Sequence, residues 1–152
     1  MIKITFCGHK NCFDKSEKLN ELLYDTLRGL LRESPEAVFY LGDYGQFDRI
    51  CNGVLKELQK EYLCLRRVFV TPYLEPSYSH LRYAAEDYDE ILFPFTDSVM
   101  PKYAITRRNE WMVDRADVVI AYVEHEWGGA AKTLEYAVKK KKRIVNLGDY
   151  ND

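Results

Sequence analysis

Short apolar runs alternate with amphipathic stretches along most of the chain. In the amphipathic stretch Ser16–Arg32, apolar residues such as Leu19, Leu23 and Leu27 recur at spacings of three and four, which predicts a helix buried along one face. Similar stretches predict helices through Ile50–Leu58, from about Ile105 to Arg115 and from about Ala131 to Lys140. The apolar runs are rich in β-branched and aromatic residues and predict strands at Ile2–Cys7, Ala37–Leu41, Leu65–Thr71, Val118–Tyr122 and Arg143–Leu147.

This alternation of strands and helices predicts an α/β fold with a doubly wound, mostly parallel sheet and helices on both faces. The continuous apolar run Val118–Tyr122 suits a strand that is covered on both sides. Tyr73–Ser98 has weak periodicity and is predicted to be an irregular excursion with one short strand at Ile91–Phe93. Because no linker or internal repeat interrupts the pattern, we expect one domain over residues 1–152.

Three glycine-containing loops follow predicted strands. In a doubly wound sheet, ligands bind beyond the carboxyl ends of the strands, where glycines let a ligand approach free backbone N–H groups. The sequence has no G-x-G-x-x-G or Walker A pattern, and a glycine pair is also common in simple strand-to-helix turns, so both interpretations stay open. The loops contribute the candidate ligand-binding residues Gly8, His9 and Lys10; Gly42, Asp43, Tyr44 and Gly45; and Gly128, Gly129, Ala130, Lys132 and Thr133.

Composition and charge narrow the function classes. Lys and Arg total 22 against 24 Asp and Glu, and this net charge of −2 makes nucleic acid an unlikely partner. Apolar residues form 47% of the 152 residues, which is enough for a buried core. The start of the chain does not have the pattern of a signal peptide, and no apolar stretch reaches the length of a membrane span, so we expect a cytoplasmic protein without a membrane partner.

The four cysteines are expected to be reduced thiols, since none forms a C-x-x-C pair. Cys7, His9 and Cys12 are close in sequence, but zinc normally requires a fourth ligand. We therefore expect neither a metal site nor a bound cofactor.

The segments Arg107–Tyr122 and Trp127–Ala137 together resemble the YpsA-like branch of the SLOG superfamily, which joins the DNA-processing protein A and Lonely Guy families. Phe6–Lys10 and Gly42–Asp48 are similar to it as well, so the resemblance extends over most of the chain. It implies a Rossmann-like fold that binds a nucleotide or a nucleotide-derived molecule such as an ADP-ribose-like signal. A homo-oligomer is implied by the resemblance alone.

Lonely Guy enzymes, which hydrolyse the N-glycosidic bond of nucleoside monophosphates, carry the motif R-x-x-x-M, matched here by Arg108 and Met112. Their second motif, P-G-G-x-G-T-x-x-E, places its acid at Glu135, although three of its other positions differ here. Through this resemblance Arg108 would hold a phosphate, and Glu135 would activate water or stabilise positive charge. The alternative for Glu135 is a solvent-facing carboxylate beside Lys139.

Several other residues allow both a binding and a structural role. Arg107 and Arg108, with Asn109, are predicted near a helix start, where positive charge is unfavourable, so at least one arginine is expected to bind a ligand. Asp43 and Asp48 would suit ribose hydroxyls, while Asp48 would also suit a helix N-cap.

Three hypotheses follow from these features. The first is a nucleotide-like small-molecule binding domain, serving as a sensor. The second is an N-glycosidic hydrolase that acts on nucleotides, and the third is a DNA-associated module, which the acidic charge balance disfavours.

Overall fold

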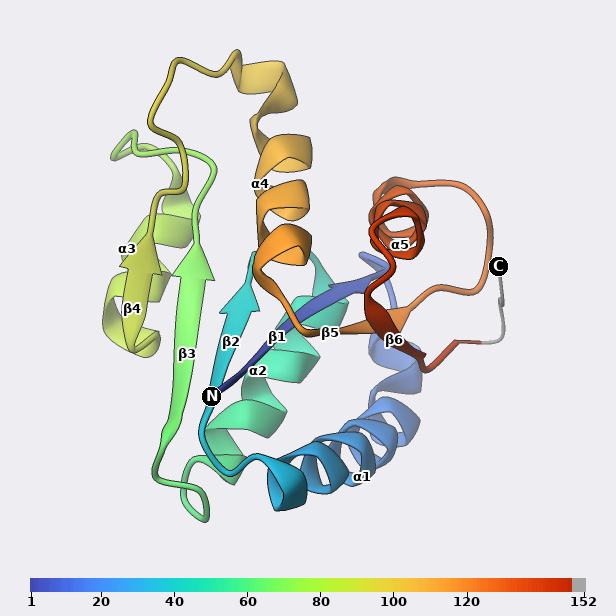
Figure 1. Cartoon of the computed structure of the whole chain (residues 1–152). Helices are drawn as coiled ribbons and strands as arrows, with labels where there is room; N and C mark the ends of the chain where they lie inside the picture. Colours follow the sequence, from blue (N-terminus) through green and yellow to red (C-terminus); the bar gives the residue numbers. More distant parts are fainter. Residues whose placement is uncertain (149–152) are drawn as a thin grey trace.

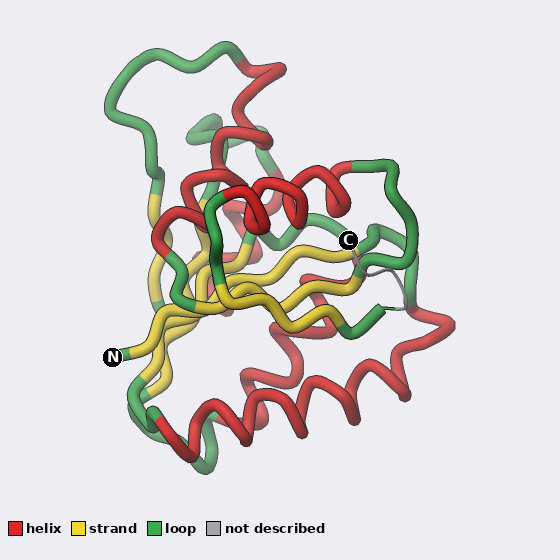
Figure 2. The backbone as a smooth tube through the Cα atoms, turned by 45° about the vertical axis from the view of Figure 1, so that its right-hand side comes forward, coloured by secondary structure: helices red, strands yellow, loops and turns green. Residues whose placement is uncertain are grey.

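The computed structural model describes residues 1–148 and contains a six-stranded parallel sheet in the order β4-β3-β2-β1-β5-β6. Figure 1 shows the sheet between helices, and the turned view of Figure 2 shows the two helical layers on either side of the strands. The α/β Rossmann-like fold expected from the sequence is confirmed. The strands are β1 (Ile2–Gly8), β2 (Ala37–Leu41), β3 (Leu65–Val70), β4 (Glu90–Leu92), β5 (Val118–Tyr122) and β6 (Arg143–Asn146).

The helices form as the apolar spacing requires, with differences at their ends. A short 3-10 turn, η1 (Phe13–Lys15), precedes the first helix. Within the described residues no helix is both long and apolar enough to cross a membrane. The helices are α1 (Ser16–Glu33), α2 (Gln46–Leu58), α3 (Ser79–Asp87), α4 (Pro101–Arg115) and α5 (Gly129–Lys139).

Apolar clusters cover both faces of the sheet. On one face, leucines of α1 and α2 pack against alternate residues of β1, β2 and β5, including Ile4, Phe39 and Ile120. On the other face, α4 and α5 cover the residues between them, such as Val119 and Ala121. This division explains why the central strands read as continuous apolar runs, since both sides of each strand are covered.

Strand order reverses between β1 and β5. From β1 the chain builds β2, β3 and β4 outward in one direction, and α4 then returns it to the other side of β1, where β5 and β6 follow. Gly8 pairs with Tyr122 at the carboxyl ends of β1 and β5, and the N–H of His9 donates to the carbonyl oxygen of Tyr122. This switch point is where doubly wound folds have room for a ligand.

Two predictions about the elements are corrected by the structure. The excursion Tyr73–Ser98 contains α3, which the periodicity did not reveal because Ala84 is its one buried residue. Helix α4 begins at Pro101, and Arg107 and Arg108 therefore lie within the helix instead of at its start. The dipole acts mainly on the first and last turns of a helix, so these two positive charges are not unfavourable at their positions in α4.

Candidate functional site

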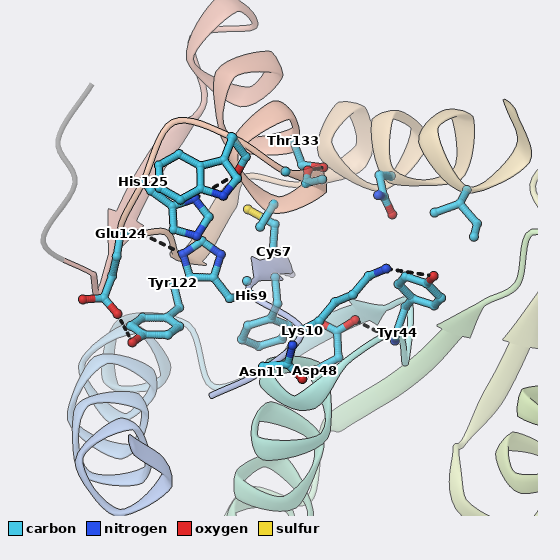
Figure 3. Close-up of a pocket in the computed structure, with 18 of the residues that line it drawn as sticks. Cys7, His9, Lys10, Asn11, Tyr44, Asp48, Tyr122, Glu124, His125 and Thr133 are labelled. Carbon is cyan, nitrogen blue, oxygen red and sulfur yellow. Dashed lines mark hydrogen bonds between the residues drawn. The ribbon is translucent and has the colours of Figure 1, made fainter. Parts of the chain in front are cut away.

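A cavity of about 730 Å³ opens at the carboxyl ends of β1 and β5, the point where the strand order reverses. Cavities of this size are typical of small-molecule sites. Figure 3 shows His9 and His125 on one side of it, Lys10, Tyr44 and Asp48 on the other, and Cys7 between them. Residues of the loops after β1 and β5 and of helices α4 and α5 supply most of the remaining lining, including Asn11, Lys15, Arg108, Asn109, Met112, Glu124, Trp127, Gly128, Gly129, Ala130 and Thr133.

The N-terminus of α5 forms part of this lining. Gly128 is the N-cap residue with φ of +96°, a conformation that favours glycine, and a Cβ there or at Gly129 would meet no atom within 4 Å. No side chain caps the helix, and its first turn contains no acidic residue. The first N–H groups of α5 and the positive end of its dipole therefore lie at the cavity, as in sites that bind anions.

The loop after β1 passes very close to α2. A Cβ on Gly8 would lie 2.2 Å from the ring of Phe47, so this position requires glycine. The carbonyl oxygen of Lys10 accepts a hydrogen bond from the N–H of Gln46, the first residue of α2. The Lys10 ammonium lies 4.5 Å from the centre of the Tyr44 ring and donates to its hydroxyl at 3.1 Å. These contacts hold a cation at the edge of the cavity.

His9 is fixed as a neutral ring. Its Nε2 accepts a hydrogen bond from the backbone N–H of Glu124 at 2.8 Å, which requires that nitrogen to be unprotonated. Burial, with the neighbouring His125 ring, lowers the pKa of His9 below its usual value. In this state His9 joins the loop after β1 to the loop after β5 and carries no charge into the cavity.

The Glu124 side chain, on the same side of the cavity as His9, has one charged and one neutral partner. Its carboxylate accepts from the Lys15 ammonium at 2.8 Å and from the Tyr122 hydroxyl. The hydrogen bond from Lys15 lowers the pKa of Glu124, so this carboxylate is ionised at neutral pH. Lys15 and Glu124 thus offset each other and leave little net charge on this side.

Asp48 is the buried acid of the cavity. It lies in the first turn of α2 and accepts from the N–H of Tyr44 at 3.0 Å, whereas the N-cap residue of this helix is Gly45. Burial raises the pKa of Asp48 to about 7, against the lowering effects of the Tyr44 N–H and the nearby Arg108 charge. A carboxyl group that titrates near neutral pH can either donate or accept a hydrogen bond to a ligand.

Arg108 lines the cavity, but its guanidinium is engaged by the protein. The side chain is 1% exposed, and its Nη1 donates to the carbonyl oxygens of Gly42 at 3.2 Å and Val70 at 2.8 Å. Its Nε donates to Asn109. Burial lowers the pKa of Arg108, while the nearby Asp48 carboxyl raises it. This arginine therefore joins α4 to the ends of β2 and β3.

Cys7 also lines the cavity, at the end of β1. Burial raises the pKa of its thiol to about 12, so it is protonated and a poor nucleophile. All four cysteines are free thiols, as expected. Within residues 1–148, no cluster of three or more His, Cys, Asp or Glu side chains could hold a metal ion.

The structure brings only part of the predicted site together. Among the candidates outside the cavity, Glu135 is exposed on α5, and Arg107 is exposed with its guanidinium 5.8 Å from the centre of the Phe95 ring. Asp43 instead pairs with His80, at 3.4 Å. The candidates at the cavity are Gly8, His9, Lys10, Tyr44, Asp48, Arg108, Asn109, Gly128, Gly129, Ala130 and Thr133, and those outside it are Gly42, Asp43, Gly45, Arg107, Lys132 and Glu135.

Sequence reasoning found Gly128 in the loop between β5 and α5 but missed the residues before it. Glu124, His125 and Trp127 all line the cavity, and none was a candidate. The signal that could have found them is their position directly after the apolar run Val118–Tyr122, at the carboxyl end of a central strand.

One family model matches residues 5–148. The chain belongs to the YspA SLOG family. The resemblance noted in the sequence is thereby confirmed. A search among curated proteins finds none that matches.

Solved structures agree with the fold of this SLOG chain. DNA processing protein A from Helicobacter pylori, described for its unique single-stranded DNA binding mode, has a TM-score of 0.65 at 19% identity. The match covers 95% of this chain and 64% of that one, so this chain spans less than two thirds of its length.

Two further structures are similar. TM1055 has a TM-score of 0.59 at 15% identity, with 95% of this chain and 72% of that one covered. The Moco carrier protein of Chlamydomonas rheinhardtii has a TM-score of 0.53 at 14% identity, with 95% and 74% covered. At these identities the similarity concerns the fold alone.

Proposed function

We propose that the cavity at the β1–β5 switch point binds a phosphorylated, nucleotide-type small molecule. The observation that carries the proposal is the N-terminus of α5, which lies at a cavity of about 730 Å³ without a side-chain cap or an acidic residue in its first turn. Backbone N–H groups at such a helix end favour a phosphate.

The opposite side of the cavity supports the same class of ligand. The Asp48 carboxyl and the Lys10–Tyr44 pair lie across from α5 and offer acceptors and donors suited to sugar hydroxyls. A molecule with an anionic group at one end and hydroxyl groups beyond it would satisfy both sides. In this role the domain would bind its ligand as a sensor.

Calorimetry with a panel of nucleoside phosphates and ribose 5-phosphate tests this proposal. Gly129→Asp puts a negative charge at the α5 N-terminus, and we expect it to weaken binding about tenfold. Gly29→Asp is the matched control, because Gly29 lies on an exposed part of α1 and adds the same charge away from the cavity. Absence of binding by any phosphorylated ligand, or equal effects of the two variants, would contradict the proposal.

A small molecule suits this cavity better than a nucleic-acid strand. The formal charge of −2 gives no general attraction for a phosphate backbone, and the lining pairs Lys15 with Glu124. We therefore expect no salt-dependent retention of single-stranded DNA. Retention that weakens steeply with salt would favour the DNA-associated alternative.

The hydrolase alternative has less support from the geometry. Glu135 lies outside the cavity, and the Arg108 guanidinium donates to two backbone carbonyl groups. If a nucleoside monophosphate is hydrolysed nonetheless, we expect Glu135→Gln to leave the release of free base unchanged. Loss of base release in that variant would return Glu135 to the catalytic role that the resemblance implies.

A further inference from the structure

Three aromatic rings form a continuous column along the edge of the cavity. The Trp127 and His125 rings are stacked with centres 3.8 Å apart and planes 13° apart. The His125 and His9 rings are stacked at 4.1 Å and 18°. Tyr122 meets His9 edge-on at 5.5 Å and closes the inner end of the column.

Hydrogen bonds and the core hold the column from its inner end. The Nε2 of His9 accepts from the N–H of Glu124, and the N–H of His9 donates to the carbonyl oxygen of Tyr122. The Nδ1 of His125 lies 2.9 Å from the carbonyl oxygen of Trp127. These bonds orient the two histidine rings, and Tyr122 beneath them belongs to the buried core.

The outer end of the column is open. Trp127 is 67% exposed, and within the part of the chain that the structure describes, His125 is the one ring that stacks on it. One face of the indole is thus occupied by His125, while the other offers a large flat aromatic surface. An exposed indole that is held in a fixed orientation is a ready platform for a planar ligand group.

Trp127 lies next to the N-terminus of α5, where the proposed function places the phosphate. Trp127 immediately precedes Gly128, the N-cap residue of α5, and both line the same cavity. A single nucleotide could therefore reach both features, with its phosphate at the helix N-terminus and its base on the indole.

We propose that the open face of Trp127 is the nucleobase subsite of this cavity, where the base stacks as the fourth ring of the column. The inference rests on the proposed function, because it gives a binding place to the base of the same ligand whose phosphate lies at the N-terminus of α5. Since stacking increases with ring overlap, the platform favours purine over pyrimidine, and either base over a ligand that has none.

The test compares AMP, CMP and ribose 5-phosphate by calorimetry on the wild-type chain and on Trp127→Ala. We expect AMP to bind most tightly, CMP less tightly and ribose 5-phosphate least tightly in the wild type. Trp127→Ala should weaken AMP binding by about 5- to 150-fold, which is the usual range for one stacked base. Ribose 5-phosphate binding should change little, and Trp127→Phe should recover most of the AMP affinity.

Trp111→Phe supplies both a control and a spectroscopic signal. Trp111 lies on α4 outside the cavity lining, against Tyr40 and Arg115, so this variant should bind AMP like the wild type. It leaves Trp127 as the single tryptophan, and we expect AMP, but not ribose 5-phosphate, to quench its fluorescence.

The outcomes separate this inference from the proposed function. The base subsite is wrong if ribose 5-phosphate binds and AMP binds no more tightly, or if Trp127→Ala lowers both affinities equally. In either case the proposal that a phosphate binds at the N-terminus of α5 stands. If neither these three ligands nor any other phosphorylated ligand of the panel binds the wild-type chain, the proposed function fails and the subsite fails with it.

Discussion

Asp48 shows how strongly a buried position can change the properties of one side chain. The residue is 8% exposed, and burial raises the pKa of its carboxyl group from 3.8 to about 7. Between these two values the folded protein binds more protons than the unfolded chain, so the free energy of unfolding falls as the pH rises from about 4 to about 7. The buried carboxyl therefore lowers stability most at neutral and higher pH.

Asp48→Asn should remove this pH-dependent loss in the free energy of unfolding. The amide can still accept the N–H of Tyr44 but never ionises, so we expect little change near pH 4 and a gain of roughly 1–4 kcal/mol near pH 8. Urea unfolding at the two pH values measures the difference. An equal effect at both would show that Asp48 titrates normally.

Gly8 is required by its contact with α2. Gly8→Ala would place a Cβ 2.2 Å from the Phe47 ring, and we expect a loss of about 1–3 kcal/mol or more from overpacking. Gly29→Ala is the matched control. A Cβ there meets no atom within 4 Å in the interior of α1, so alanine should add about 0.5–1 kcal/mol. Thermal unfolding of the two variants should shift in opposite directions.

At the scale of the elements, a buried arginine joins β3 to α2 and to the end of α3. Arg67 on β3 is 5% exposed and donates to Gln59, Asn52 and the carbonyl oxygen of Asp87. The Asp87 carboxylate also receives the Lys56 ammonium. This network fixes α3, which buries little apolar surface of its own.

Arg67→Met should break that connection. We expect a loss of about 3 kcal/mol in the free energy of unfolding, because several buried polar groups lose their partner. Arg66→Met, at the preceding residue of the same strand, removes an exposed ion pair with Glu90 and should cost less than about 1 kcal/mol. Similar losses in urea unfolding of the two variants would contradict this assignment.

Burial is distributed unevenly over the whole molecule. The central strand β5 is buried along its full length, whereas β4 at the sheet edge has no buried residue and α3 has one. We expect amide hydrogens of β1 and β5 to exchange last and those of α3 and β4 to exchange first. Mass spectrometry of exchanged peptides checks this order, and uniform exchange would contradict it.

The same distribution places the site. The cavity lies at the carboxyl ends of β1 and β5, two central strands that are covered on both faces. Two of the loops that line it therefore begin at buried strands of the sheet, while β4 lies at the far edge. A rigid base of this kind favours a binding site with a fixed geometry.

The hydrophobic pattern alone determined the central strands and the helices α1, α2 and α5 to within a few residues, because each buries a continuous run or a regular stripe. It also predicted a ligand site beyond the strand ends, where the cavity lies. The pattern missed α3 because that helix is fixed by polar contacts at its end, and such contacts leave no apolar period.

Only the tertiary structure decided which side chains share the cavity. Arginine is usually exposed, yet Arg108 is buried because α4, the end of β2 and the end of β3 meet around its guanidinium. The stacking of His9 on His125 joins loops that are far apart in sequence, while Glu135, which a motif count had selected, faces solvent. Sequence spacing records local periodicity, whereas burial and stacking depend on partners that only the folded chain brings together.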